Sequence, residues 1–323
     1  MATGTTTLLD IAKRNGSDPV VGLIDDASNY APEFSIIPAR AMPGTSYKIT
    51  RKTALPTAAF RNANEGITIG KTNYIQETKS MHFLDCQLQL DEAITKGDEG
   101  RIGDLMTQQA QDSFQAAIQY VGSQFYYGTS NDSKGFVGAL AQSVGKWPAG
   151  GTTSKTSAFL IWVNPQGVEF VVGNDGSFSL PDWMRQAVNP TATTQKMVWV
   201  TNLSSYIGLQ VGSSSAVWRV SGIDSSNALT DARGAGLVSK VPLNRRMGLR
   251  WFMNRTAAYL LQKNRAIAGY IAATSAGSPT QEVAGNRVFS EDLAPLGGVP
   301  ITVTDSLVDT ETNAGTADTY ATE

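Results

Sequence analysis

The stretch KITRKTALPTAAFRNANEGITIGKT, residues 48–72, constrains the fold more than any other part of the chain. It is typical of two extended, polar strands joined at a tip. An isolated two-stranded hairpin is only marginally stable in water, and these strands bring few apolar residues for a core of their own. The sequence therefore predicts a projecting arm, and we expect a neighbouring copy of the chain to support it.

A long amphipathic helix is predicted over residues 102–125. Apolar residues recur there at steps of three and four, with glycines at both ends: Ile102, Leu105, Met106, Ala110, Phe114, Ala117, Ile118, Val121 and Phe125. At 1.5 Å per residue such a helix is about 40 Å long. We expect the whole stripe, Phe114 included, to pack against its own domain, with glutamines on a wetter side.

The second half of the chain reads mainly as strands. Short β-branched or aromatic runs follow a Gly- and Ser-rich break at 148–157 and predict a second domain: AFLIWV, GVEFVVG, KMVWVTNL and AVWRVSGI. Further on, a strand, a helix capped by Asn254 and another strand are expected. The predicted fold class is α+β.

Composition excludes several classes of protein. The 323 residues are 41% hydrophobic and 17% charged, which is typical of a globular protein, and the net charge of -2 gives no general reason for tight binding to nucleic acid or membranes. A single cysteine cannot form an intramolecular disulfide. No run of 18 apolar residues and no basic segment before an apolar stretch occurs, so we expect neither a membrane span nor an export signal.

The sequence contains few candidate catalytic residues. His82 is the one histidine, and Cys86 lies four positions later in a strand-like run whose alternation predicts a buried, inert thiol. Phosphate-binding glycine loops are missing. Adjacent acids such as Asp25/Asp26, Asp98/Glu99 and Glu291/Asp292 are expected to be solvated or to cap helices. We expect no catalytic, metal or cofactor site, and no enzyme.

The charges are segregated along the chain. Residues 41–81 carry six basic and two acidic residues, net +4, whereas residues 91–112 carry two basic and six acidic residues, net -4. Residues 233–265 hold eight basic residues and no acid, and residues 300–323 hold five acids and no base. Such blocks can complement one another within a chain or between subunits. Block 233–265 could instead contact phosphates, but Trp251 and Phe252 lie in an apolar strand, which favours a structural role.

Several phrases resemble the major capsid proteins of tailed double-stranded DNA bacteriophages, which have the Hong Kong 97 fold. LPTAAFRNANEGITIGKT resembles the tip of their extended loop, and LDEAITKGDEGRIGDLMTQQAQDSFQAAIQYVGSQFYYGTSN resembles the lead-in and spine helix, with KGFVGAL following. RWFMNRTAAYLL and GGVPITVTDSLVDTET are similar to the closing strand, helix and strand. The order of arm, hairpin, acidic lead-in, long helix and strand-rich region also matches.

This resemblance implies a division of the chain. Residues 1–40 would be the N-terminal arm and 41–90 the extended loop. Residues 91–147 would form much of the peripheral domain, with the spine helix at 101–127. Residues 148–323 would be mainly the axial domain, with room for strands that return to the peripheral domain.

The resemblance also implies a function. The chain would be a structural protein that self-assembles, as hexamers and pentamers, into the icosahedral head shell around the phage DNA, and it would belong to the virion after assembly in the host cytoplasm. Portal and a separate scaffolding protein are implied partners, a decoration protein is a further candidate, and DNA contacts would be weak. No cofactor and no membrane are implied. Two alternatives stay open, an encapsulin-type compartment shell and a soluble enzyme.

The charge blocks suggest which residues meet between subunits. The extended-loop candidates are Lys48, Arg51, Lys52, Phe60, Arg61, Asn64 and Lys71. Their predicted acidic partners on the neighbouring copy are Asp91, Glu92, Asp98, Glu99 and Asp104.

Overall fold

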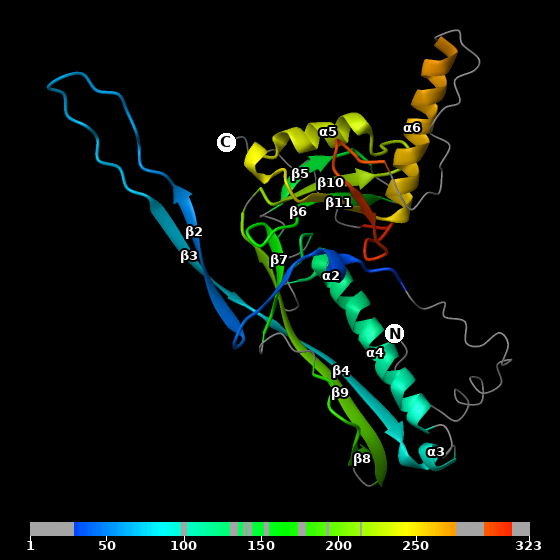
Figure 1. The fold of residues 1–323 in the computed structure, drawn as a ribbon. Helices are drawn as coiled ribbons and strands as arrows, with labels where there is room; N and C mark the ends of the chain where they lie inside the picture. Colours follow the sequence, from blue (N-terminus) through cyan, green and yellow to red (C-terminus); the bar gives the residue numbers. More distant parts are fainter. Residues whose placement is uncertain are drawn as a thin grey trace.

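The computed structural model describes residues 29–97, 102–129, 135–137, 140, 144–151, 155–173, 179–191, 194–213, 215–275 and 294–311, without the side chains at 94, 97, 102, 189–191, 194 and 266–275. Figure 1 shows three parts: a body around one sheet, a long limb in which a helix lies along a second sheet, and a projecting hairpin. Among the described helices, none is long and apolar enough to cross a membrane.

The sheet of the body has five strands in the order β12-β11-β6-β10-β5. Their bounds are β5 Gly145–Pro148, β6 Thr156–Trp162, β10 Val217–Ile223, β11 Leu249–Met253 and β12 Ile301–Val303. Strand β6 lies in the centre, antiparallel to β10 and β11, and every residue of it is buried. A continuous apolar run of this kind is typical of a strand covered on both faces.

Two helices and a short turn accompany this sheet: α5 Asp231–Lys240, α6 Arg255–Ser275 and the 3-10 helix η3 Leu243–Arg245. Helix α5 lies across the sheet, and α6 rises from its edge (Figure 1). The Asn254 side chain accepts a hydrogen bond of 2.8 Å from the amide of Ala257. The predicted N-cap of α6 is therefore confirmed.

The second sheet forms the limb. Its strands are β1 Ala39–Ala41, β4 His82–Asp91, β7 Val168–Val172, β8 Met184–Thr191 and β9 Thr194–Val211. The 18-residue β9 is central: β4 pairs with it along one edge, and β7 and β8 pair with it along the other. The predicted strand KMVWVTNL is confirmed within β9, which is much longer than that phrase. Strands from the second half of the chain thus join a sheet with β1 and β4.

Helix α4, Ile102–Tyr127, runs along the limb as one continuous element, as predicted, and follows the short helix α3 Glu92–Gly97. Its C-terminal end is in the core, where Phe125 is 1% exposed and its ring centroid lies 4.7 Å from that of Phe136 and 5.4 Å from that of Phe170. Phe114, however, is 44% exposed. Its predicted packing in the core is wrong, because this part of the helix faces an open groove.

The predicted hairpin is confirmed by β2 Ser46–Ala54 and β3 Asn73–Ser80, which pair antiparallel from Ser46↔Ser80. Residues 55–72 lie beyond this ladder. Strand β4 leaves the arm and joins β9, so residues 82–90 are part of the limb. Only the root of the arm has an apolar cluster, which contains Tyr47, Met81 and Val171.

Candidate subunit interface

The tip of the arm exposes large apolar side chains. Phe60 is 109% exposed and Ile69 is 94% exposed, and Leu55 and Ile67 are also exposed. The arm projects away from the body and from α4 (Figure 1). Sequence reasoning identified Phe60 but missed the other three, although the alternation in GITIG was a signal for Ile67 and Ile69. A cluster of this kind at the end of an arm without a core is typical of an interaction site.

Polar contacts shape the turn at the end of the arm. The Arg61 guanidinium donates to the backbone oxygen of Glu65 at 2.9 Å, and the amide of Asn62 donates to the Glu65 carboxylate at 3.0 Å. The hydrogen bond from the Asn62 backbone amide lowers the pKa of Glu65. Asn64 has φ 71°, a left-handed conformation that asparagine tolerates better than most residues. Arg61 and Asn64 therefore hold the tip in shape within their own chain.

The basic residues of the arm fall into two groups. At the root, Arg51 donates to the backbone oxygen of Val211 at 3.4 Å, while Glu77 pairs with Lys79 at 2.7 Å and lies 3.9 Å from Arg51. The hydrogen bond from Lys79 is the main reason why the pKa of Glu77 is lowered. Three further basic residues are exposed and make no ion pair among the described residues: Lys48, Lys52 and Lys71.

The predicted acidic partner lies at the far end of the limb from the arm (Figure 1). Glu92 already pairs with Lys96 at 3.0 Å and with Arg185 at 2.7 Å, and these bonds, that of Lys96 first, lower its pKa. Asp91 accepts from the amide of Ala93 at 2.9 Å. Asp104 is exposed in the first turn of α4. The other two predicted acids, Asp98 and Glu99, lie outside the described residues.

A shallow groove of about 480 Å³ runs beside α4, between the helix and the limb sheet. Its exposed lining is mostly apolar and includes Phe114 and Ile118 of α4 together with Leu180 and Leu203. Sequence reasoning assigned Phe114 and Ile118 to the core and missed the two leucines. The glutamines that surround Phe114 on the helix were the signal that this face is not fully buried.

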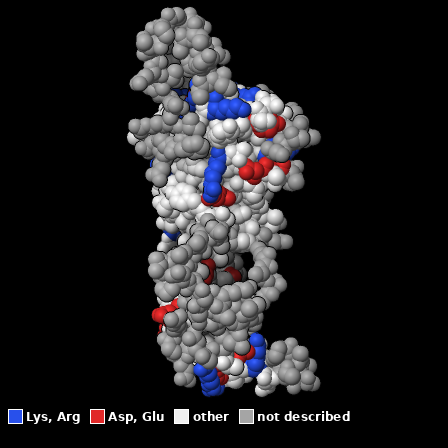
Figure 2. Space-filling model, turned by 90° about the vertical axis from the view of Figure 1, so that its right-hand side faces the viewer, with Lys and Arg blue, Asp and Glu red and all other residues white. Residues whose placement is uncertain are grey.

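Charge does not gather into one large patch on the face seen in Figure 2. Basic and acidic residues lie close together at the upper and lower ends, and neither sign forms a continuous area among the residues drawn in colour. This mixed pattern gives no support to a broad phosphate-binding surface on that face.

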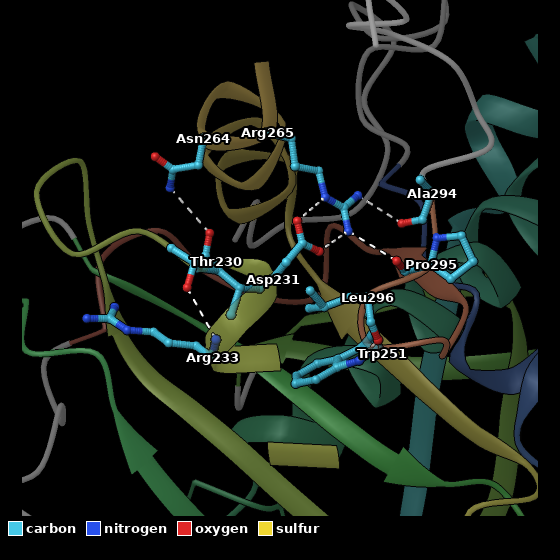
Figure 3. Close-up of polar contacts among 10 residues, drawn as sticks. Thr230, Asp231, Arg233, Trp251, Asn264, Arg265, Ala294, Pro295 and Leu296 are labelled. Carbon is cyan, nitrogen blue, oxygen red and sulfur yellow. Dashed lines mark hydrogen bonds and ion pairs between the residues drawn. The ribbon is translucent and has the colours of Figure 1, made fainter. Parts of the chain in front are cut away.

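Basic block 233–265 is used largely within the chain. Arg265 donates to Asp231 at 2.6 and 2.9 Å and to the backbone oxygens of Ala294 and Pro295 at 2.9 and 3.1 Å (Figure 3). These four bonds join α6, the start of α5 and the returning chain. Arg255 pairs with Asp305 at 2.5 Å, which links this block to the acidic block 300–323. The contacts support a structural role for these arginines.

His82 and Cys86 both lie on β4. His82 is half-buried at the root of the arm, beside Arg51 and Lys79. Cys86 is half-buried on the inner side of the strand, and burial raises the pKa of its thiol, which disfavours the nucleophilic thiolate. In the part of the chain that the structure describes, no cluster of three or more His, Cys, Asp or Glu side chains could hold a metal ion.

Comparison with known proteins gives one family. The family model described as "Major capsid protein GP7" matches residues 35–314. No curated protein matches the chain.

Solved structures resemble the chain at low sequence identity. The structure of bacteriophage Epsilon15 aligns with a TM-score of 0.65 and 14% identity, covering 96% of this chain and 98% of that one. The capsid of Myoviridae phage XM1 aligns with a TM-score of 0.45 and 11% identity, covering 69% of this chain and 100% of that one. Mycobacterium phage Adephagia gives 0.45 and 12%, covering 67% and 98%. The alignment with the Epsilon15 structure, which covers nearly all of both chains, shows that the two chains share a fold.

Proposed function

The chain belongs to the family of the major capsid protein GP7, and we propose that it builds the icosahedral head shell around the DNA of a tailed phage, with its arm joining neighbouring subunits. As a major capsid protein it is a structural, shell-forming protein. Its fold is α+β and Hong Kong 97-like, as predicted, and aligns along nearly all of its length with that of phage Epsilon15. This family favours a phage capsid over an encapsulin-type shell, and it supports a structural role over an enzymatic one.

The observation that carries the proposed role of the arm is its exposed apolar tip. Phe60 and Ile69 have no packing partner in their own chain among the described residues, and the groove beside α4 presents an apolar surface with Phe114 and Ile118. The arm points away from α4, so the tip of one chain is positioned for a groove on another (Figure 1). If every copy gives one tip and receives one, the contact repeats around a closed assembly.

Charge has a supporting role in this proposal. Lys48, Lys52 and Lys71 would lie near the acidic segment of the neighbouring copy, where Asp104 is exposed three residues before Thr107, which lines the groove. Exposed ion pairs stabilise by about 0–1 kcal/mol each, so they set register more than affinity. Arg51, Arg61 and Glu92 make contacts within their own chain, and their share in the interface is correspondingly smaller.

The rest of the organisation follows from the family resemblance and is part of the proposal. Residues 1–40 would be the N-terminal arm and 41–90 the extended loop together with β4, which returns to the limb sheet. Residues 91–147 would form much of the peripheral domain and 148–323 mainly the axial domain, with β7, β8 and β9 as strands that return to the peripheral domain. The chain would form hexamers and pentamers in the host cytoplasm, with portal and a separate scaffolding protein as partners and a decoration protein as a further candidate.

Substitution of Phe60 tests the role of the tip. Phe60→Ser should leave the circular dichroism spectrum and the melting temperature unchanged, because the side chain is fully exposed, but should reduce shell formation seen by electron microscopy and sedimentation. Phe60→Leu is the control: it keeps an apolar side chain and should assemble. Normal shells from Phe60→Ser would contradict the proposal.

Charge reversal separates the electrostatic contribution of the arm from the contribution of its apolar tip. The triple change of Lys48, Lys52 and Lys71 to Glu should weaken assembly mainly at low salt, because screening reduces the repulsion as ionic strength rises. Lys at Asp98 and Glu99 should partly restore assembly. Unchanged assembly of the triple variant at low salt would show that charge does not guide the arm.

A further inference from the structure

Two consecutive tyrosines at the end of α4 each bind one buried carboxylate. The hydroxyl of Tyr126 donates to Glu33 at 3.0 Å, and the hydroxyl of Tyr127 donates to Glu311 at 2.8 Å. Glu33 belongs to the short helix α2, Glu33–Ile36, whereas Glu311 is the last described residue of the chain. The end of the long helix therefore holds one segment from each end of the sequence.

The surroundings of the two carboxylates differ in charge. Glu311 pairs with the buried Arg219 at 2.8 Å and also accepts from Ser157 at 2.5 Å. Glu33 is 0% exposed, and its partners are three hydroxyl groups. Besides Tyr126, these are Thr304 at 2.6 Å and Ser306 at 3.2 Å. Among the described residues, no cation pairs with Glu33, so a negative charge there is not neutralised.

Charged groups on the segments that contact Glu33 and Tyr127 are already paired with one another. Asp305, between its two hydroxyl partners, binds Arg255 at 2.5 Å and accepts from the amide of Tyr30 at 3.0 Å. Arg219 and Glu311 form their own pair on the side of Tyr127. None of these groups is in a position to compensate a charge on Glu33.

The packing around Glu33 leaves little space for water. At Gly122, which lies on α4 beside this cluster, a Cβ atom would come within 2.5 Å of the Ser306 hydroxyl and 3.1 Å of the Ala31 methyl group. The ring of Phe34, next to Glu33, stacks on Phe170 with a centroid distance of 4.7 Å. A charged Glu33 can gain water only if α2 moves away from α4.

We propose that Glu33 is a proton-dependent clasp: its neutral carboxyl holds α2 against the end of α4, and loss of the proton loosens α2. The Glu311–Arg219 pair holds the C-terminal segment independently of that proton. Burial raises the pKa of Glu33, and the bond from Thr304 offsets this in part. A carboxyl group whose pKa is raised by folding stabilises the folded state below its unfolded pKa, and that stabilisation is lost as the pH rises through the folded pKa. Docking of α2 should therefore weaken toward high pH.

Hydrogen exchange of the full-length chain across a pH series tests this clasp. The amides of Ile36 and Ile37, which bond to the backbone oxygens of Pro32 and Glu33, report on α2. After correction for the intrinsic exchange rate, their protection should fall by about tenfold per pH unit between the unfolded pKa of Glu33 and its raised folded pKa, and should level off above the folded pKa. In Glu33→Gln, their protection should not depend on pH.

The adjacent tyrosines supply a matched pair of variants. Tyr126→Phe removes a hydrogen bond that favours the charged form of Glu33, so the folded pKa should rise and the fall in protection should extend to higher pH. Tyr127→Phe should leave the midpoint of the pH-dependent fall in protection unchanged from that of the unmodified chain. The proposal is overturned if protection of α2 in the unmodified chain is independent of pH, if Glu33→Gln keeps the same dependence, or if both tyrosine variants shift the midpoint equally. Should Glu33→Gln not fold, the tyrosine pair decides alone.

Discussion

Phe125 and Phe114 lie on the same helix, but we expect alanine at these two positions to have very different effects. Phe125 is 1% exposed and contacts Phe136 and Phe170, so Phe125→Ala leaves a cavity and should lower the free energy of unfolding by about 3–5 kcal/mol. Phe114 is 44% exposed, so roughly half of its surface is already in water. Phe114→Ala should cost about 1 kcal/mol, since full burial of such a side chain is worth about 1.5–3 kcal/mol.

Urea unfolding of the unassembled chain, followed by circular dichroism, measures both values. Both variants replace Phe with Ala on α4, so the change in helix propensity is the same in both and does not contribute to the difference between them. Equal losses for the two variants would refute the argument that α4 is buried at its C-terminal end and open at Phe114. Phe114→Asp extends the test, because it should fold but should not form shells.

Three further predictions concern other parts of the chain. Asn254→Ala should lower the free energy of unfolding by about 0.5–2 kcal/mol through loss of the α6 cap, which thermal melting would detect. Arg265→Lys keeps the charge opposite Asp231 but loses the forked set of bonds, and should speed hydrogen exchange in residues 294–299 while shell formation continues. Alanine at both His82 and Cys86 should leave assembly and infectivity unchanged, because the proposed shell-forming role needs no catalytic group at either position and burial disfavours the Cys86 thiolate.

Local signals in the sequence were sufficient for the elements that depend on them. The periodicity of residues 102–125 identified α4, and Asn254 marked the start of α6, because the spacing of apolar residues and the chemistry of a cap lie within a few neighbouring positions. The polar hairpin was identified for the same reason. The phrases shared with phage capsid proteins identified the family.

Long-range contacts could not be predicted in this way. Periodicity shows that Phe114 is on the apolar face of α4, but it does not show that a groove separates this position from the limb sheet. The cluster around Glu33 joins residues about 270 positions apart, as the bond to Thr304 shows, and no local pattern marks such a pair. The contact predicted between the arm and the acidic segment that includes Asp104 joins two different subunits. Neither the sequence nor the structure of a single chain shows these two surfaces together.

Chemical cross-linking of assembled shells tests the central claim most directly. In a chain with Cys86→Ser, Ile69→Cys places one thiol at the tip of the arm and Ile118→Cys places another in the groove beside α4. A short bifunctional maleimide should then join different subunits into ladders on a denaturing gel, but only after shells have formed, and neither single-cysteine chain should give ladders. If shells form and the double variant shows no intersubunit cross-links, the arm tip of one subunit does not occupy the groove of its neighbour.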